Sequence, residues 1–336
     1  MLEDKGNFLF DLEKKYDSLP WLAETRARLD DLASAGRCPH ALLLHGRAGT
    51  GRRQLALWLT ESLLGADPSR PSSSAEGAPE AGHPDFVALE FEEKKNSKEK
   101  KTLIGIDQVR ELIEFLELTS HGPAGRVAVI YPADAMTLKA ANSLLKTLEE
   151  PPAGAVIVLI SESLARLPAT VVSRCQRIRV PLPPATQALD WLAEQVPGAE
   201  LGPLLEFTGG APLATLQLHE ADFAGEASQF AADIKDLEES RENPVVIAAR
   251  WKKQPDLALR WLYWRLSRRV REGLGVTPDK VLEAPVGVEY GPGTVHACFD
   301  QMSRIRELRR VINGGINAEL NIAGLLMDWY GGFGRQ

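Results

Sequence analysis

Three features of the sequence predict an α/β domain built on a parallel sheet, followed by a helical region. Short, wholly apolar runs alternate with amphipathic stretches in the first half of the chain. A glycine-rich loop separates the first of these runs from a helical pattern, and the pattern stays helical after the proline-rich stretch 181–184. Apolar strands of this kind are typical of mostly parallel sheets with helices on both faces.

The elements of the α/β part follow one another in a regular order. The first unit is a strand at 41–45, a glycine-rich loop at 46–53 and a helix at 54–64, the arrangement that opens a nucleotide-binding α/β fold. Further along we expect strands at 85–92, 127–130, 156–160 and 178–180, with helices beginning after an Asp107 N-cap and spanning 140–150, and a short helix at 167–172.

The second half of the chain has the periodicity of amphipathic helices, with apolar side chains three and four residues apart. The expected helices are 224–237, 244–253, 256–270, 295–312 and 318–330. The proline-rich stretch 181–184 predicts a domain boundary.

Composition excludes several classes of protein. The chain has 336 residues, 44% hydrophobic and 25% charged, which is enough to bury a core in two or three domains. The net charge of −7 argues against coating DNA by bulk positive charge. Three scattered cysteines (Cys38, Cys175 and Cys298) fit a reducing cytosol, and the chain contains no apolar run long enough for a membrane helix. We therefore expect a cytoplasmic protein.

The glycine-rich loop is a degenerate phosphate loop. Its pattern should be G-x-x-x-x-G-K-[ST], and the glycines Gly46, Gly49 and Gly51 are in place. Arg52 stands at the lysine position, and Arg53 replaces the hydroxyl that ligates Mg²⁺. These residues predict a loop that holds a nucleotide or anion weakly or stays empty, the alternative being a turn needed for packing alone.

A second requirement for ATP hydrolysis is also missing. The strand 127–130 should be followed by acidic residues that organise Mg²⁺ and water, but Tyr131 and Pro132 stand there. Asp134 lies close by, as a capping aspartate or as a substitute metal ligand. Two losses in one site predict that the chain does not hydrolyse ATP.

Several motifs resemble those of the clamp-loader subunits of bacterial DNA polymerase III, which are AAA+ proteins. Residues 142–152 (NSLLKTLEEPP) are similar to the family's NALLKTLEEPP signature, and Ser173-Arg174-Cys175 matches its SRC motif. Shorter matches occur in the same order across roughly residues 20–215. These are PWL at 20–22, HPDF at 83–86 and IDQVR at 106–110.

The resemblance implies three domains: an AAA+ Rossmann-like domain at 1–182, a small helical lid at 183–220 and a helical collar for oligomerisation at 221–336. It implies a subunit without ATPase activity of its own, within a hetero-oligomeric DNA-directed DNA polymerase holoenzyme, a nucleotidyltransferase. The implied partners are ATPase motor subunits, the clamp-opening delta subunit and, through the complex, the sliding clamp and primed DNA.

By the same resemblance, Arg174 is an arginine finger that acts in trans on ATP held by a neighbouring motor subunit. An arginine of this kind stabilises the charge on the transferring phosphoryl group. The alternative is a surface arginine that pairs with a local carboxylate.

Two departures from the family's pattern concern ligands. Many relatives carry a zinc-binding cysteine cluster after the phosphate-loop helix, but residues 65–84 contain no cysteine, so we expect no zinc. The lid arginine of the ATPase members falls near residues 210–213, where the sequence has no arginine.

Basic and aromatic residues gather between 250 and 271. They are Arg250, Lys252, Lys253, Arg260, Arg265, Arg268, Arg269 and Arg271, with Trp251, Trp261, Tyr263 and Trp264. Such a group can bind single-stranded nucleic acid, but apolar side chains at helical spacing favour packing within the collar.

Two other functions remain open from the sequence. One is an active ATPase motor of the same family, which Arg53 and Tyr131 disfavour. The other is a stand-alone nucleic-acid-binding protein, which the net charge of −7 disfavours.

Overall fold

The computed structural model describes residues 18–65, 83–91, 102–122, 125–273, 292–312 and 316–333. The chain divides into two compact units. The first comprises Met1–Pro197 with Gly210–Ala214, and the second Gly198–Gly209 with Thr215–Gln336. The three-domain division with boundaries at 182 and 220 stays a prediction.

A five-stranded sheet forms the centre of the first unit in the described part of the chain. Its strands are β1 (Ala41–His45), β2 (Phe86–Leu89), β3 (Val127–Ile130), β4 (Val156–Ser161) and β5 (Gln176–Arg179). They lie in the order β2-β3-β4-β1-β5, and every pair is parallel. The predicted fold class, a parallel α/β domain with a helical C-terminal region, is thereby confirmed.

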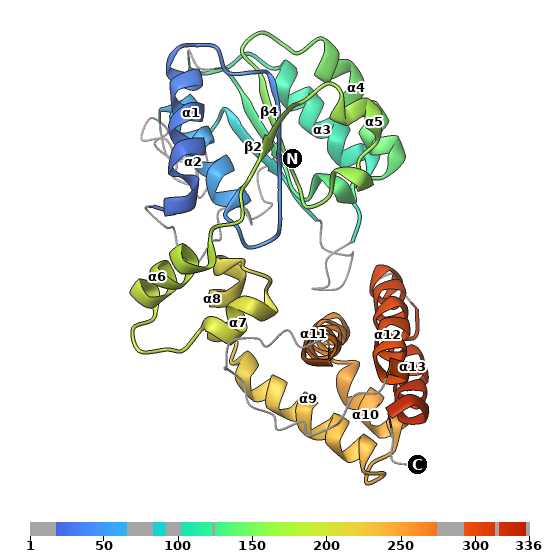
Figure 1. The fold of residues 1–336 in the computed structure, drawn as a ribbon. Coiled ribbons are helices and arrows are strands. Elements are labelled where there is room, and N and C mark those ends of the chain that lie inside the picture. The colour runs from blue at the N-terminus through green and yellow to red at the C-terminus, as the bar shows by residue number, and fades with distance from the viewer. Residues whose placement is uncertain are drawn as a thin grey trace, which may run out of the picture. The chain divides into compact units, whose positions relative to one another are not determined.

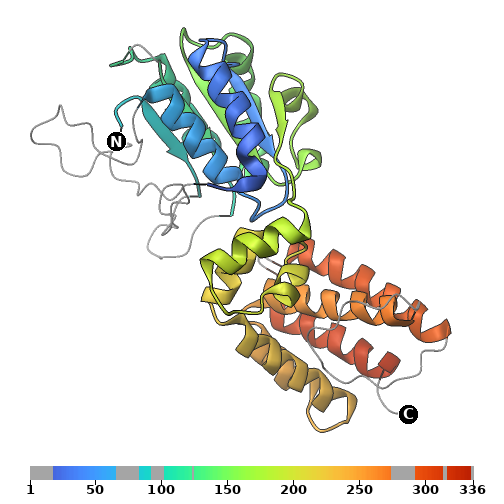
Figure 2. The same cartoon turned by 60° about the vertical axis from the view of Figure 1, so that its left-hand side comes forward.

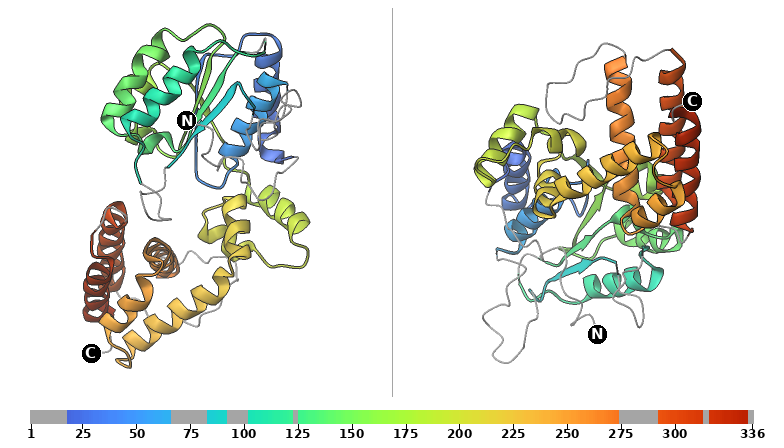
Figure 3. Two further views of the ribbon diagram at one scale, coloured as in Figure 1. Left: turned by 180° about the vertical axis from the view of Figure 1, so that it is seen from behind. Right: turned by 90° about the horizontal axis from the view of Figure 1, so that it is seen from below.

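Helices cover both faces of this sheet, as Figures 1 and 3 show. On one side lie α1 (Ala23–Ser34) and α2 (Arg52–Leu64), and on the other α3 (Ile106–Glu117), α4 (Leu138–Glu149) and the short α5 (Ala169–Val172). Alternate strand residues point to opposite faces. Ala41 and Leu43 belong to the core shared with α3 and α4, while Leu42, which lies between them along the chain, is also fully buried.

Helix starts differ from the expectation by a few residues, for local reasons. Asp107 was the expected N-cap of α3, but Gly105 is the N-cap, and its N–H donates to Gln108 Oε1 at 2.9 Å. Asp107 lies in the first turn, where a carboxylate favours the helix dipole. α4 begins at Leu138 because the Thr137 hydroxyl accepts the N–H of Ala140.

The remaining elements are helical. They are the 3₁₀ turns Pro20–Leu22, Ala133–Ala135 and Leu164–Arg166, and the helices α6 (Ala185–Gln195), α7 (Gly202–Phe207), α8 (Pro212–Glu220), α9 (Phe223–Glu238), α10 (Pro244–Trp251), α11 (Pro255–Gly273), α12 (Pro292–Val311) and α13 (Ala318–Phe333). In the second unit α11, α12 and α13 run side by side (Figure 2). None of the described helices is both long and apolar enough to cross a membrane.

The second unit is organised around buried tryptophans and a buried carboxylate. Trp251, Trp261 and Trp329 are at most 3% exposed and lie in one apolar core. Asp233 is also buried, and it accepts hydrogen bonds from Trp251 Nε1 at 2.8 Å and Arg250 Nη2 at 2.7 Å. The packing predicted for Trp261 is confirmed, and Trp264, the other tryptophan of that prediction, is partly buried against the same core.

Candidate functional site

The phosphate loop joins β1 to α2 and is closely covered by other parts of the first unit. Gly49 and Gly51 have φ of 77° and 95°, in the left-handed region that favours glycine. A Cβ at Gly49 would lie 2.4 Å from Ala214 Cβ, and one at Gly51 would lie 2.5 Å from Leu19 Cδ1. These glycines therefore permit close packing as well as the turn.

Gly46 shows the same crowding at the start of the loop. A Cβ there would lie 2.6 Å from the Val180 carbonyl oxygen, at the end of β5. The position therefore requires glycine for the loop to pass over the carboxyl end of that strand.

Several peptide groups of the loop are bound by the protein itself. The Gly49 carbonyl accepts the N–H of Leu213 at 3.0 Å, and the Thr50 carbonyl accepts Trp21 Nε1–H at 2.9 Å. The Thr50 side chain is buried, and its hydroxyl donates to the Arg47 carbonyl at 2.8 Å. The stretch near 210–213, where the lid arginine is missing, thus closes directly on the loop.

Arg52 is buried at the first position of α2, with 6% of its surface exposed. Its Nη1 has no hydrogen-bond partner among the described residues. Burial lowers the pKa of Arg52, whereas Tyr131, Glu162 and Asp134 act in the opposite direction. A guanidinium N–H in such a place has the chemistry to bind an anionic oxygen.

Arg53 and Tyr131 occupy the two positions at which an ATPase would hold Mg²⁺. The structure brings them together, with the Arg53 guanidinium 5.0 Å from the centre of the Tyr131 ring. Arg53 Nη2 is also 4.0 Å from Glu90 Oε1. A cation over an aromatic ring replaces the hydroxyl and carboxylate oxygens that Mg²⁺ prefers, so these residues do not fit a Mg²⁺–nucleotide site.

Asp134 binds protein groups. Its carboxylate accepts the N–H of Glu162 at 3.3 Å and lies 3.7 Å from Arg166 Nη1, with 6% of the side chain exposed. Over the described ranges, no three His, Cys, Asp or Glu side chains form a group that could hold a metal ion. Most of the stretch 65–84, on which the expectation about zinc depends, lies outside those ranges.

The SRC turn lies between α5 and β5 and is anchored by its neighbours. Ser173 Oγ donates to the Thr170 carbonyl at 3.1 Å, which tightens the turn. Cys175 is 8% exposed and belongs to the same core as Val171 and Leu148. Burial raises the pKa of the Cys175 thiol to about 11, so this cysteine packs as a neutral thiol at physiological pH.

Arg174 projects from this turn and forms the local ion pair that the sequence left open. Its Nε and Nη2 both contact Glu149 Oε1, at the end of α4. Its Nη1 donates to the Thr170 carbonyl at 3.0 Å. The arginine side chain is 34% exposed, so part of the guanidinium group faces solvent.

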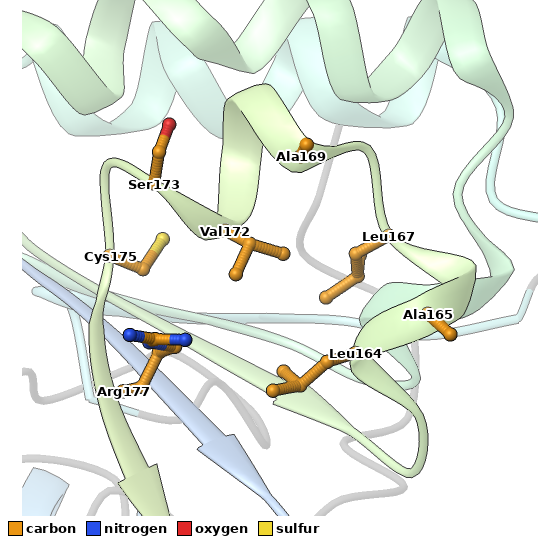
Figure 4. Close-up of a pocket in the computed structure, with 8 residues that line it drawn as sticks. All are labelled: Leu164, Ala165, Leu167, Ala169, Val172, Ser173, Cys175 and Arg177. Atoms are coloured by element: carbon orange, nitrogen blue, oxygen red, sulfur yellow. The ribbon is translucent and has the colours of Figure 1, made fainter.

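A shallow hollow of about 590 Å³ lies beside the SRC turn. In Figure 4 the side chains of Leu164, Leu167, Val172 and Cys175 point toward its interior, and Arg177 borders it from the start of β5. Ser173 and Cys175, the two neighbours of Arg174, both line this hollow. The arginine therefore lies at the rim of an apolar surface depression.

Two contacts at these sites could not be predicted from the sequence. Glu149 lies within the NSLLKTLEEPP motif, but no spacing rule connects it to an arginine 25 residues later. No spacing rule predicts the closure of the loop by Leu213 and Ala214 either. Both contacts depend on tertiary packing.

Known proteins resemble this chain over most of its length. The family model described as DNA polymerase III, delta subunit, matches residues 22–183. The delta-prime subunit of DNA polymerase III from Pseudomonas aeruginosa is 32% identical over 93% of this chain and 97% of its own length. The delta-prime subunit from Escherichia coli is 31% identical over 92% and 94%. A solved gamma subunit-related protein from Thermotoga maritima is 21% identical, covers 89% of this chain and 97% of its own, and has a TM-score of 0.45.

Proposed function

The chain belongs to the family of DNA polymerase III delta-prime subunits, AAA+ clamp-loader proteins of DNA replication, and from this membership we propose a specific role for it. It is a non-hydrolysing subunit of the clamp loader, and it supplies Arg174 as an arginine finger to the ATP site of a neighbouring subunit. Its partners are the ATPase motor subunits and the clamp-opening delta subunit, in the cytoplasm. It meets the sliding clamp and primed DNA through the complex.

The contact between Arg53 and Tyr131 is the main observation in support of the proposal that this chain does not hydrolyse ATP. Hydrolysis needs a hydroxyl on Mg²⁺ and a carboxylate near the attacking water. At a ring distance of 5.0 Å, the guanidinium of Arg53 and the phenol of Tyr131 occupy both places and bind each other. The Arg53 guanidinium would repel Mg²⁺, and the Tyr131 side chain supplies no carboxylate to replace the missing hydroxyl.

The topology of the sheet supports the role in trans. β1 and β5 are parallel neighbours, and the loop follows the end of β1 while Arg174 precedes the start of β5. Val180, whose carbonyl lies against Gly46, follows the far end of β5 from Arg174, and the four residues of this strand span about 13 Å. Arg174 therefore lies at the amino ends of the strands, whereas the phosphate loop lies at their carboxyl ends. An arginine finger at this position is too far from the loop of its own chain and is suited to act on a neighbouring chain.

The test is a reconstituted clamp loader in which a single motor site, the one next to this subunit, keeps its phosphate-loop lysine. With Arg174→Ala, DNA-stimulated hydrolysis at that site should fall by roughly 10³-fold, because the finger's charge stabilisation is lost. Arg110→Ala is the matched control, since Arg110 is an exposed arginine of the same unit (62% of its side chain). Assembly is followed by gel filtration.

Unchanged turnover with Arg174→Ala in an assembled loader would refute the finger. The isolated chain with MgATP is measured beside the complex. Turnover by that chain would favour the alternative, an active ATPase motor subunit.

A further inference from the structure

The ion pair between Glu149 and Arg174 joins the last residue of α4 to the turn after α5. We propose that Glu149 is a positioning residue for the finger: it holds the arginine in the conformation in which the guanidinium presents its outer edge to a neighbouring phosphate. This inference rests on the proposed role of Arg174 in trans.

The hydrogen bonds of Arg174 restrain the guanidinium on two sides. An arginine carries five N–H donors in a planar fork. Nε and Nη2 contact a single carboxylate oxygen of Glu149, on the side of the group nearest the chain. Nη1 donates to the Thr170 carbonyl at 3.0 Å and lies 3.4 Å from Ser173 Oγ. These contacts engage four of the five N–H donors, and the second N–H of Nη2, on the outer edge of the fork, is the one suited to donate to a phosphoryl oxygen.

The carboxylate comes from a firmly held backbone position. Leu148, the residue before Glu149, is 1% exposed and lies in the same core as Val171 and Cys175. The Leu148 carbonyl is 3.0 Å from His40 Nε2, which ties the end of α4 to the segment before β1. The backbones of Glu149 and of the SRC turn are therefore fixed by the same core, and this restrains both partners of the ion pair.

The pair is too exposed to act chiefly as a stabilising contact. The side chains of Arg174 and Glu149 are 34% and 49% exposed. Ion pairs at such exposure add little to folding stability because water screens them and two long side chains must be ordered. The ordering itself is the useful result: a guanidinium already held in one conformation loses less entropy when it meets the phosphate.

The test uses the same reconstituted loader with one active motor site next to this subunit. Glu149→Ala should lower kcat at that site by about 10-fold and leave KM for ATP unchanged, because the finger is present but poorly oriented. Glu149→Gln keeps an oxygen that accepts from Arg174 and should retain most of the activity. Glu150→Ala is the control, since Glu150 is an exposed carboxylate one residue away.

A double substitution separates positioning from other effects. In the Arg174→Ala background, Glu149→Ala should cause no further loss of kcat, and the melting temperature of the single variant should match that of the unaltered chain. The inference is overturned if Glu149→Ala leaves kcat unchanged, raises it, or lowers it equally without Arg174. If Arg174→Ala itself has no effect, the proposed function fails; if Arg174→Ala is defective and Glu149→Ala is normal, the positioning role alone fails.

Discussion

At the scale of single residues, Asp85 shows how a motif residue can serve structure. It is 1% exposed and follows the His83-Pro84 pair just before β2. Its carboxylate accepts the N–H groups of His121 and Gly122, each at 2.9 Å, and lies 3.7 Å from Arg126 Nε. The carboxylate thus fixes the segment after α3 to the start of the sheet.

The charge of Asp85 predicts a pH dependence of stability. Burial raises the pKa of this carboxyl, but the hydrogen bonds from His121 and Gly122 and the charge of Arg126 outweigh it, so the pKa lies below its usual value. Because the pKa of Asp85 is lower in the folded chain, its stabilising contribution is fully present above the pKa of an unfolded aspartate, about 3.9. This contribution is lost as the pH falls through the pKa of the folded state.

We therefore expect Asp85→Asn to lower the free energy of unfolding by about 2–3 kcal/mol at pH 7, because two backbone N–H groups and the buried Arg126 lose their anionic partner. The difference from the unaltered chain should narrow below pH 4. Urea unfolding at several pH values measures it. Asp107→Asn, at an 86% exposed side chain, is the control, and a pH-independent difference would contradict the assignment.

At the scale of elements, the order of strands and helices followed from local patterns, whereas their exact starts did not. α2 begins at Arg52, two residues before the predicted start, because Gly51 with φ of 95° is its N-cap. β5 spans Gln176–Arg179 and so begins before the predicted 178–180. It is an edge strand whose residues are mostly exposed, which weakens the apolar pattern.

The phosphate loop should be sensitive to small changes in volume. Gly49→Ala places a Cβ 2.4 Å from Ala214 Cβ in a left-handed residue, whereas Gly36 has a similar φ of 62° and nothing within 4 Å of the added atom. We expect Gly36→Ala to cost about 1–2 kcal/mol from the backbone alone, and Gly49→Ala about 2 kcal/mol more from overpacking. Chemical denaturation of both variants measures the difference. Equal costs would mean that α8 does not close on the loop.

At the scale of the whole molecule, charge and packing bear on how the chain meets DNA. The net charge is −7. Among the basic residues between 250 and 271, Arg250, Arg269 and Arg271 hydrogen-bond to Asp233, Glu238 and Glu206. The neighbouring Trp251 and Trp261 are in the core, so their rings cannot stack on bases.

The isolated chain should therefore bind primed DNA with a dissociation constant above about 100 µM at physiological salt, at the weak limit of non-specific binding. Fluorescence anisotropy with a labelled primer-template, repeated at several salt concentrations, measures this. The assembled clamp loader serves as the positive control. Salt-sensitive binding by the isolated chain in the micromolar range would instead support a stand-alone nucleic-acid-binding protein.

The candidate sites were predictable in part. The residues of the degenerate loop and of the SRC turn could be chosen from the sequence because each is a short, contiguous motif. Their contacts could not, since Arg53 meets Tyr131 and Arg174 meets Glu149 through the packing of separate elements. A motif states which side chains are present, and the fold decides which of them touch.

The sequence by itself determined the parallel α/β class, the helical second half, the loss of the Mg²⁺ ligands and the position of Arg174 in the chain. These properties follow from apolar periodicity, glycine spacing and residue identity, all of which are local. The tertiary structure alone decided that the loop is closed by Leu213 and that Glu149 pairs with Arg174. Such contacts join segments distant in the chain, and they exist because burial of one common core brings α4, α5 and the sheet together.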